Sequence, residues 1–416
     1  MKNIYFSIIA LLLFSSVAVS QSYQRCATTE YTNELIQNDP STVDRMNQLE
    51  GAVQNWIRNN KDEVERNSGA VITIPVVVHV VYRTSSQNIP DSRIFSQIAV
   101  LNEDFRRTNS NASSTPAGFV GVAADTEIEF CLAVRDPFGA AHPGITRTQT
   151  STNSFSTNNQ IKYTATGGID AWPTSQYLNI WVGPLGSQLL GYAQFPGSGS
   201  AATDGVVILH AAFGRNSPIA NYNLGRTTTH EVGHYFNLRH IWGDSNCGND
   251  QVSDTPTQQS SNFGCPFFPR VTCINGPNGD MFMNYMDYTD DACMNLFTAG
   301  QKIRMVGSIN SSRAGLISSK GCDAPVVGIE PLSSYSLFEL FPNPTSDKLN
   351  LNIQFTEQLD FEVDIINMLG ESVANYTYKN TLGGEFEMDL ITQPKGIYFA
   401  RILVEDKVYS RKIIKD

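Results

Sequence analysis

Three of the chain's six histidines lie between positions 230 and 240, in the stretch TTTHEVGHYFNLRHIWGD (227–244). On a helix, His230 and His234 leave the same face about one turn apart, so both rings can bind one metal ion from one side. Zinc accepts neutral imidazole and lowers the pKa of a water molecule that it binds. Glu231, beside that water, can take its proton during attack on a carbonyl carbon. The pattern therefore predicts metal-assisted hydrolysis of amide bonds.

A catalytic zinc needs a third protein ligand and one open position. His240 lies too far beyond His234 to share its helix face, so the chain must turn after about Phe236. Asn237 stands at that point and, after Gly, Asn most readily adopts the left-handed conformation that ends a helix. We expect this turn to bring His240 back to the metal. The alternative, a chance HExxH on an ordinary helix, leaves the third histidine unexplained.

The pattern H-E-x-x-H-x-x-N-x-x-H resembles the metzincin zinc peptidases, whose motif has Gly where this chain has Asn237. A second stretch, MFMNYMDYTDDACM (281–294), resembles the Met-turn of their pappalysin branch. The resemblance implies that Met286 underlies the zinc site and that Tyr288 steadies the oxyanion, a task for which a phenol O–H is suited. The alternative is a methionine and a tyrosine that merely pack in a core. The resemblance spans roughly residues 70–325.

These residues need a scaffold, and the pattern of apolar residues supplies one. A β-branched run at 71–83 predicts a buried strand, and a helix with one apolar face follows it at 90–109. LLGYAQF (189–195) looks like the edge strand along which metzincins align an extended substrate by main-chain hydrogen bonds. With further strands near 128–134 and 177–182, we expect an α/β metzincin-like catalytic domain, a twisted mixed sheet plus the zinc-binding active-site helix.

The chain contains seven cysteines. Six of them allow 15 pairings, so the residues alone do not choose between these pairings. The pappalysin resemblance implies Cys247–Cys273 and Cys265–Cys293, which leaves Cys131 with Cys322. The seventh, Cys26 in QRCATTEY, resembles the cysteine switch of pappalysin zymogens, in which a thiolate occupies the open zinc position. An incidental or intermolecular cysteine is the alternative.

The loop CGNDQVSDTPT (247–257) is dense in hard oxygen ligands of the kind that calcium binds. It resembles a calcium loop of the family, which would place Asp250, Ser253 and Thr255 nearest the ion, with Asp254 beside them. The alternative is an Asp-rich turn without metal.

Substrate preference is where the resemblance is weakest. It implies a basic residue just after the scissile bond, held by an Asp immediately before the last cysteine of the Met-turn segment. That position is Ala292 here, and an alanine cannot form a salt bridge. Asp290 or Asp291 could substitute if the loop is altered.

The two ends of the chain predict export. Residues 1–20 have the basic, apolar and small-residue regions of a signal peptide, and residues 21–69 are expected to form a helix-rich pro-segment. After the catalytic domain (70–325) and a linker (326–335), residues 336–416 alternate as a small all-β sandwich. LFPNPTSDKLNL, NMLGE and KGIYFARI resemble the C-terminal sorting domain of type IX secretion. A generic binding module is the alternative.

Composition limits the partners. The net charge of −11 argues against nucleic acid and anionic membrane surfaces, and we expect no transmembrane segment. The expected protein is a secreted or outer-membrane-surface zinc endopeptidase, made as a zymogen, whose partners are protein or peptide substrates and the type IX secretion machinery. The rival hypothesis is a non-catalytic, zinc-containing surface adhesin, which would need neither Glu231 nor Tyr288.

Overall fold

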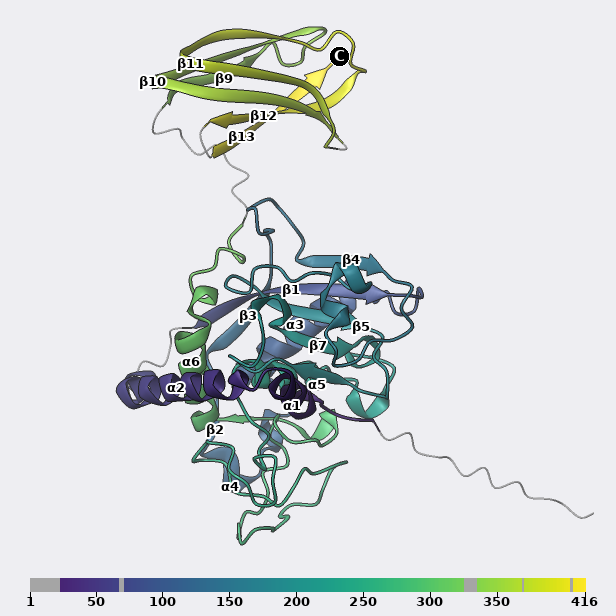
Figure 1. Ribbon diagram of the computed structural model, residues 1–416, viewed down its shortest axis with the longest axis vertical. Helices are drawn as coiled ribbons and strands as arrows, with labels where there is room; N and C mark the ends of the chain where they lie inside the picture. Colours follow the sequence, from purple (N-terminus) through teal and green to yellow (C-terminus); the bar gives the residue numbers. More distant parts are fainter. Residues whose placement is uncertain (1–22, 67–70, 325–334, 369, 405–406) are drawn as a thin grey trace, which may run out of the picture. The chain divides into compact units, whose positions relative to one another are not determined.

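The computed structural model describes residues 23–66, 71–324, 335–368, 370–404 and 407–416. The chain divides into two units, residues 1–325 and 326–416, each with its own hydrophobic core. The signal peptide predicted at 1–20 lies outside the described residues, as does most of the linker predicted at 326–335. Figure 1 shows the elements of both units.

A six-stranded sheet forms the centre of the first unit, in the order β3-β1-β5-β7-β6, with β4 also paired to β1. Every pairing is parallel except that of β6 with β7, so the predicted mixed sheet is confirmed. β6 lies at the end of the sheet, within the stretch expected to form the edge strand. The strands are β1 (Ile72–Tyr82), β3 (Ile128–Leu132), β4 (Ile145–Gln149), β5 (Leu178–Gly183), β6 (Gly191–Ala193) and β7 (Val206–Leu209).

Three helices pack against this sheet: α3 (Asp91–Phe105), α5 (Arg226–Tyr235) and α6 (Ala299–Ser312). The β-branched residues of β1 and the apolar face of α3 share one buried core with α5, because each element has an apolar side that water excludes. Two short strands, β2 (Ala123–Ala124) and β8 (Phe297–Thr298), pair beside the short helix α4 (Ala117–Val120). Among the described residues, no helix combines the length and apolar character needed to cross a bilayer.

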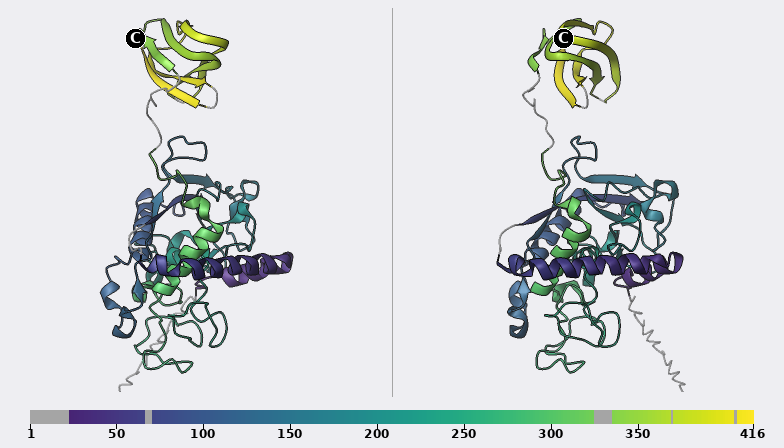
Figure 2. Two further views of the ribbon diagram at one scale, coloured as in Figure 1. Left: turned by 90° about the vertical axis from the view of Figure 1, so that its left-hand side faces the viewer. Right: turned by 60° about the vertical axis from the view of Figure 1, so that its left-hand side comes forward.

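The predicted pro-segment contains two helices, α1 (Thr28–Asn38) and α2 (Ser41–Arg66). Both views in Figure 2 show α2 crossing α6. The approach is close because α6 has a glycine there: a Cβ added to Gly307 would lie 3.1 Å from Trp56 and from Ile57. Apolar residues of α2, Val53, Trp56 and Ile57, therefore pack against α6.

Three disulfides close the catalytic unit: Cys131–Cys322, Cys247–Cys273 and Cys265–Cys293. These are the pairings that the family resemblance implied. The last two hold the long segment between α5 and α6 in place, where regular secondary structure is sparse. Cys26 is free and buried.

The second unit is all-β, as predicted, and its five strands form a single hydrogen-bonded sheet that curves around one core. The alternating stretches DKLNLNI (347–353) and FEVDII (361–366) predict two strands but are parts of one long strand, because the chain continues through an irregular register shift instead of turning. The strands are β9 (Tyr335–Phe341), β10 (Lys348–Asn367), β11 (Ser372–Asp389), β12 (Gly396–Val404) and β13 (Lys407–Lys415).

Candidate active site

Helix α5 carries the predicted metal-binding motif, and all of its residues are buried. It ends at Tyr235, and Asn237 follows with φ 73°, which confirms the predicted left-handed turn. The Leu238 N–H donates to the Gly233 carbonyl oxygen at 2.9 Å, closing the turn with a hydrogen bond typical of helix ends. The chain then reverses and carries His240 back toward α5.

The three histidines converge through the same ring nitrogen. His234 Nε2 lies 3.1 Å from His230 Nε2 and 3.1 Å from His240 Nε2. The opposite nitrogen of each ring is held by the protein, which fixes ring orientation. Nδ1 contacts the Tyr285 carbonyl oxygen in His230 and the Leu238 carbonyl oxygen in His234, both at 2.7 Å, and Asp244 Oδ1 in His240 at 2.5 Å.

The three converging Nε2 atoms suit a metal ion. Together with Cys26 Sγ, their ligand atoms lie within 4.8 Å of one another, and this is the only such group among the described residues. Burial, followed by the neighbouring rings, lowers the pKa of His230 and of His234 well below the usual range, which favours the neutral imidazole that metals require. The described residues also leave Glu231 Oε1 buried without a hydrogen-bond partner beside this group.

The other carboxylate oxygen of Glu231 faces the N-terminal segment. Oε2 accepts a hydrogen bond from Thr28 Oγ1 at 2.9 Å and a weaker one from Cys26 Sγ at 3.5 Å. Burial raises the pKa of Glu231 to about 8, although the hydrogen bonds from Thr28 and Cys26 oppose this shift. The carboxyl group is therefore covered by the segment that also brings the thiol to the histidines.

Two residues of the predicted Met-turn lie at the same place. The Tyr288 hydroxyl contacts His240 Nε2 at 3.0 Å, so it faces the metal-binding atoms. Met286 is fully buried, and a Cβ added to Gly233 would lie 2.5 Å from its sulfur. Met286 is thus packed directly against α5 between the two helical histidines.

The N-terminal segment also covers the free edge of β6. The Ala27 N–H donates to the Gly191 carbonyl oxygen, and the Leu190 N–H donates to the Gln24 carbonyl oxygen, both at 3.0 Å. The Ala193 N–H donates to Thr28 Oγ1 at 2.8 Å. An extended substrate would need these same donors and acceptors.

Arg25 lies in a buried pocket next to position 292. Its guanidinium forms an ion pair with Asp291 Oδ1 at 2.9 Å, and both side chains are almost fully buried. It also lies 4.6 Å from the centre of the Tyr222 ring. The carboxylate of Asp291, one residue before Ala292, therefore binds a basic side chain.

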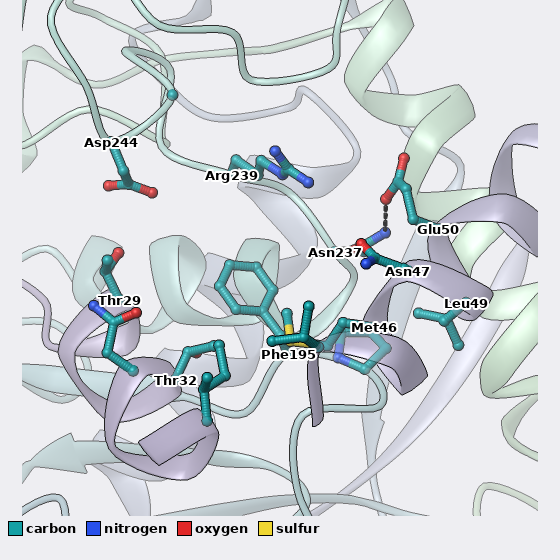
Figure 3. Close-up of a pocket in the computed structure, with 15 residues that line it drawn as sticks. Thr29, Thr32, Met46, Asn47, Leu49, Glu50, Phe195, Asn237, Arg239 and Asp244 are labelled. Carbon is teal, nitrogen blue, oxygen red and sulfur yellow. Dashed lines mark hydrogen bonds between the residues drawn. The ribbon is translucent and has the colours of Figure 1, made fainter. Parts of the chain in front are cut away.

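Helix α2 of the pro-segment reaches the turn after α5. The Glu50 carboxylate accepts two hydrogen bonds from Arg304, both at 2.8 Å, and one from Asn237 Nδ2 at 3.3 Å. Burial opposes ionisation of Glu50, but the hydrogen bonds and charge of Arg304 outweigh it and lower the pKa to about 2. Figure 3 shows the hydrogen bond between Glu50 and Asn237 at the side of a cavity of about 310 Å³, which residues of α1 and α2 line together with Phe195 and Arg239.

The predicted calcium loop is held by protein contacts. Asp250 is buried and accepts hydrogen bonds from the Thr255 hydroxyl and the Val252 N–H, while Ser253 is exposed. Both carboxylate oxygens of Asp254 accept hydrogen bonds at the start of α6, from Thr298 and Gly300. Calcium binding here stays a prediction.

Several residues at the site were missed by sequence reasoning. Asp244 follows His240 by four residues, a spacing that could have indicated its orienting contact. Arg25 and Thr28 flank the predicted switch cysteine, but no pattern in the sequence connects them with Asp291 or Glu231.

Comparison with known proteins agrees with this geometry. A family model described as pregnancy-associated plasma protein-A matches residues 158–310, and one for the secretion system C-terminal sorting domain matches residues 339–416. An extracellular metalloprotease of Pyricularia oryzae is 31% identical over 309 residues, covering 72% of this chain and 93% of that protein. A promirolysin mutant of Tannerella forsythia shares 47% identity at a TM-score of 0.65, covering 72% of this chain and 97% of that one. Mature mirolysin of the same organism, in complex with a cleaved peptide, shares 52% identity at a TM-score of 0.59, covering 62% and 97%.

Proposed function

Because the chain belongs to the pappalysin family of metallopeptidases, we propose that its buried histidine cluster is a zinc site that hydrolyses peptide bonds within protein substrates. The family and the sorting domain identify the chain as a secreted metalloprotease with a catalytic metal. The proposed zinc site and its peptidase activity are supported by the convergence of three histidine Nε2 atoms beside Glu231. An adhesin would have no use for that glutamate.

Each residue has a role that its position supports. His230, His234 and His240 hold zinc, which when bound polarises the scissile carbonyl and makes water more acidic. Glu231 accepts the proton of the attacking water and returns it to the departing amine nitrogen. Tyr288 donates its O–H to the oxyanion, and Met286 supports the helix beneath the ligands.

We further propose that residues 21–69 keep the enzyme latent. The Cys26 thiol takes the open coordination position, for which its place among the ligand atoms is the support. The Thr28 hydroxyl forms a hydrogen bond with the Glu231 carboxylate, and the main chain of residues 24–28 pairs with the edge of β6. Removal of this segment would free the metal, the general base and the substrate-binding edge together. An incidental cysteine would not account for these additional contacts.

The second unit directs export by the type IX route to the cell surface or medium. We propose that the type IX secretion machinery recognises it. The domain boundaries given above, with a signal peptide at 1–20 and a sorting domain at 336–416, are part of this proposal.

The decisive experiment compares peptide cleavage by the activated protein and its Glu231→Ala variant, with zinc content measured in both. We expect cleavage that a chelator abolishes, and a loss of about 10²- to 10⁴-fold in kcat/KM for the variant at unchanged zinc content. Glu129→Gln, on the remote strand β3, is the matched control and should leave the rate unchanged. One bound zinc per chain without cleavage by the wild type would favour the adhesin.

Calcium is tested separately. If the loop at 247–257 binds calcium, the midpoint of thermal unfolding should rise with added calcium in the wild type and not in Asp250→Asn. An equal midpoint with calcium and with a calcium chelator would remove calcium from the proposal.

A further inference from the structure

A buried lysine lies beside β6 and has no part in the chemistry described above. Lys162 is fully buried, and its Nζ donates to the Thr203 carbonyl oxygen at 2.7 Å. Among the described residues no carboxylate lies within ion-pairing distance of it. Nζ instead lies 5.4 Å from the centre of the Trp181 ring and 5.0 Å from that of Tyr192. Burial lowers the pKa of Lys162 to about 7, although the charge of Asp204 opposes the shift, and the ammonium form depends on aromatic faces and hydrogen-bond acceptors.

The last wall of this pocket comes from the pro-segment. The ring of Tyr31, on α1, lies 5.0 Å from that of Tyr192, and Lys162 Nζ lies 4.9 Å from the Tyr31 ring centre. The Tyr31 hydroxyl lies 2.9 Å from Asn159 Oδ1 and 3.1 Å from Gln194 Oε1, two acceptors that share its single proton. It accepts a long hydrogen bond from Lys162 Nζ at 3.5 Å. The pocket thus uses both the donor and the acceptor capacity of a phenol.

The pocket adjoins the substrate-binding edge. Tyr192 and Gln194 are two residues apart at β6, so their side chains leave the same face of the strand. Gly191, next to Tyr192, lies against the catalytic glutamate: a Cβ added there would be 3.1 Å from Glu231 Cγ. A substrate chain paired with β6 would present a side chain beside Tyr192 and Gln194, within a few residues of the cleaved bond.

We propose that, once the pro-segment has left, the pocket formed by Asn159, Lys162, Tyr192 and Gln194 is a substrate subsite that selects a tyrosine side chain. Tyr31 fills the same subsite in the latent protein. The inference rests on the proposed peptidase function and adds a second point of selection, distinct from the Asp291 pocket. Phenylalanine fills the aromatic walls but leaves Asn159 Oδ1 without the hydroxyl, while Gln194 Oε1 and Lys162 Nζ keep only their hydrogen bonds to Thr203, so tyrosine is preferred over it.

The test uses the full chain after removal of its pro-segment and a set of peptides identical except at one position. That position is scanned over the residues flanking the cut, and carries Tyr, Phe or Ala. We expect one position at which kcat/KM is about 10-fold higher for Tyr than for Phe, and higher again than for Ala. Lys162→Met should bring the ratio of kcat/KM for the Tyr and Phe peptides near one.

A second variant guards against a folding defect in the first. Asn159 has a left-handed backbone, φ 64°, which glycine also adopts, so Asn159→Gly removes the amide oxygen without strain. It should lower the same ratio. Cleavage with no tyrosine preference at any position, or a preference that both variants retain, would overturn the subsite and leave the peptidase intact. Absence of cleavage of every peptide by the wild type would instead overturn the proposed function, and the subsite with it.

Discussion

At the scale of single residues, the site depends on which atom of each side chain the protein already uses. Nδ1 of each of the three histidines contacts a carbonyl or carboxylate oxygen, and their Nε2 atoms converge. The two carboxylate oxygens of Asp291 also have separate partners. Its Oδ2 accepts the N–H groups of Leu224 and Arg226 at the start of α5, while Oδ1 binds Arg25. Departure of Arg25 would leave one buried carboxylate oxygen for another cation.

This arrangement predicts a basic residue just after the scissile bond, despite Ala292. We expect Asp291→Asn to lower the ratio of kcat/KM for peptides with Arg and with Leu at that position by at least about 30-fold, because a buried charge would lose its partner. The ratio is informative even if the variant is less stable, because both peptides meet the same enzyme. Asp290→Asn is the control and should keep the preference. An unchanged ratio in Asp291→Asn would place the selecting residue elsewhere.

At the scale of elements, helix α5 and the Met-turn pack closely because Gly233 has no side chain. Gly233 lies in a helix, where alanine would normally add about 1 kcal/mol of stability. Here the added Cβ would meet the buried sulfur of Met286. Overpacking lowers the free energy of unfolding by about 1–3 kcal/mol, which outweighs the gain in helix propensity.

We therefore expect Gly233→Ala to lower both the thermal midpoint and the affinity for zinc, measured by calorimetry and by competition with a chelating dye. The double variant Gly233→Ala with Met286→Ala should recover part of the zinc affinity, because the smaller side chain makes room. A single variant that is more stable than the wild type would show that Met286 moves aside freely.

The docking of α2 on the catalytic domain should depend on pH. The pKa of Glu50 is lowered to about 2 by Arg304, so the ionised form contributes to docking above its ordinary pKa of 4.5. This contribution is present in full at neutral pH and is lost as the pH falls from about 4.5 toward 2. We expect the protection factors for hydrogen exchange in α2, which are corrected for the intrinsic exchange rate at each pH, to fall over that window in the wild type.

In Glu50→Gln the exchange should already be faster at neutral pH and should lack that acid step. Asp44→Asn, an exposed change on α2 itself, provides the comparison and should behave as the wild type. Identical acid profiles for Glu50→Gln and the wild type would mean that the Arg304 pair does not hold the pro-segment.

At the scale of the whole molecule, the two units have separate cores and separate tasks. The catalytic unit buries its own sheet and helices, and the sorting domain encloses a core of its own. Two units with separate cores are expected to be stable independently of each other.

Deletion of residues 326–416 should therefore leave the thermal midpoint of the catalytic unit and its kcat/KM unchanged, while abolishing export in a cell that has the type IX route. Activity assays on purified protein and on cell fractions would check both halves. A truncated protein that unfolds at a lower temperature would show that the catalytic unit needs the sorting domain.

Much of the active site follows from the sequence because its geometry is local. The spacing of His230 and His234 needs only a helix, and the return of His240 needs only the left-handed Asn237, whose conformation the structure bears out. The mixed sheet follows from the order of the predicted strands and helices, and its edge strand was implied by the family resemblance. Such features depend on residues a few positions apart, which the sequence displays directly.

The contacts that support the proposed latency and selectivity were decided by the tertiary structure alone. Thr28 and Glu231 are 203 positions apart, Arg25 and Asp291 are 266 apart, and Tyr31 and Lys162 are 131 apart. No periodicity relates residues at such separations. They meet because a pro-segment docked on α6 and β6 carries them there, and docking depends on the shape of two folded surfaces.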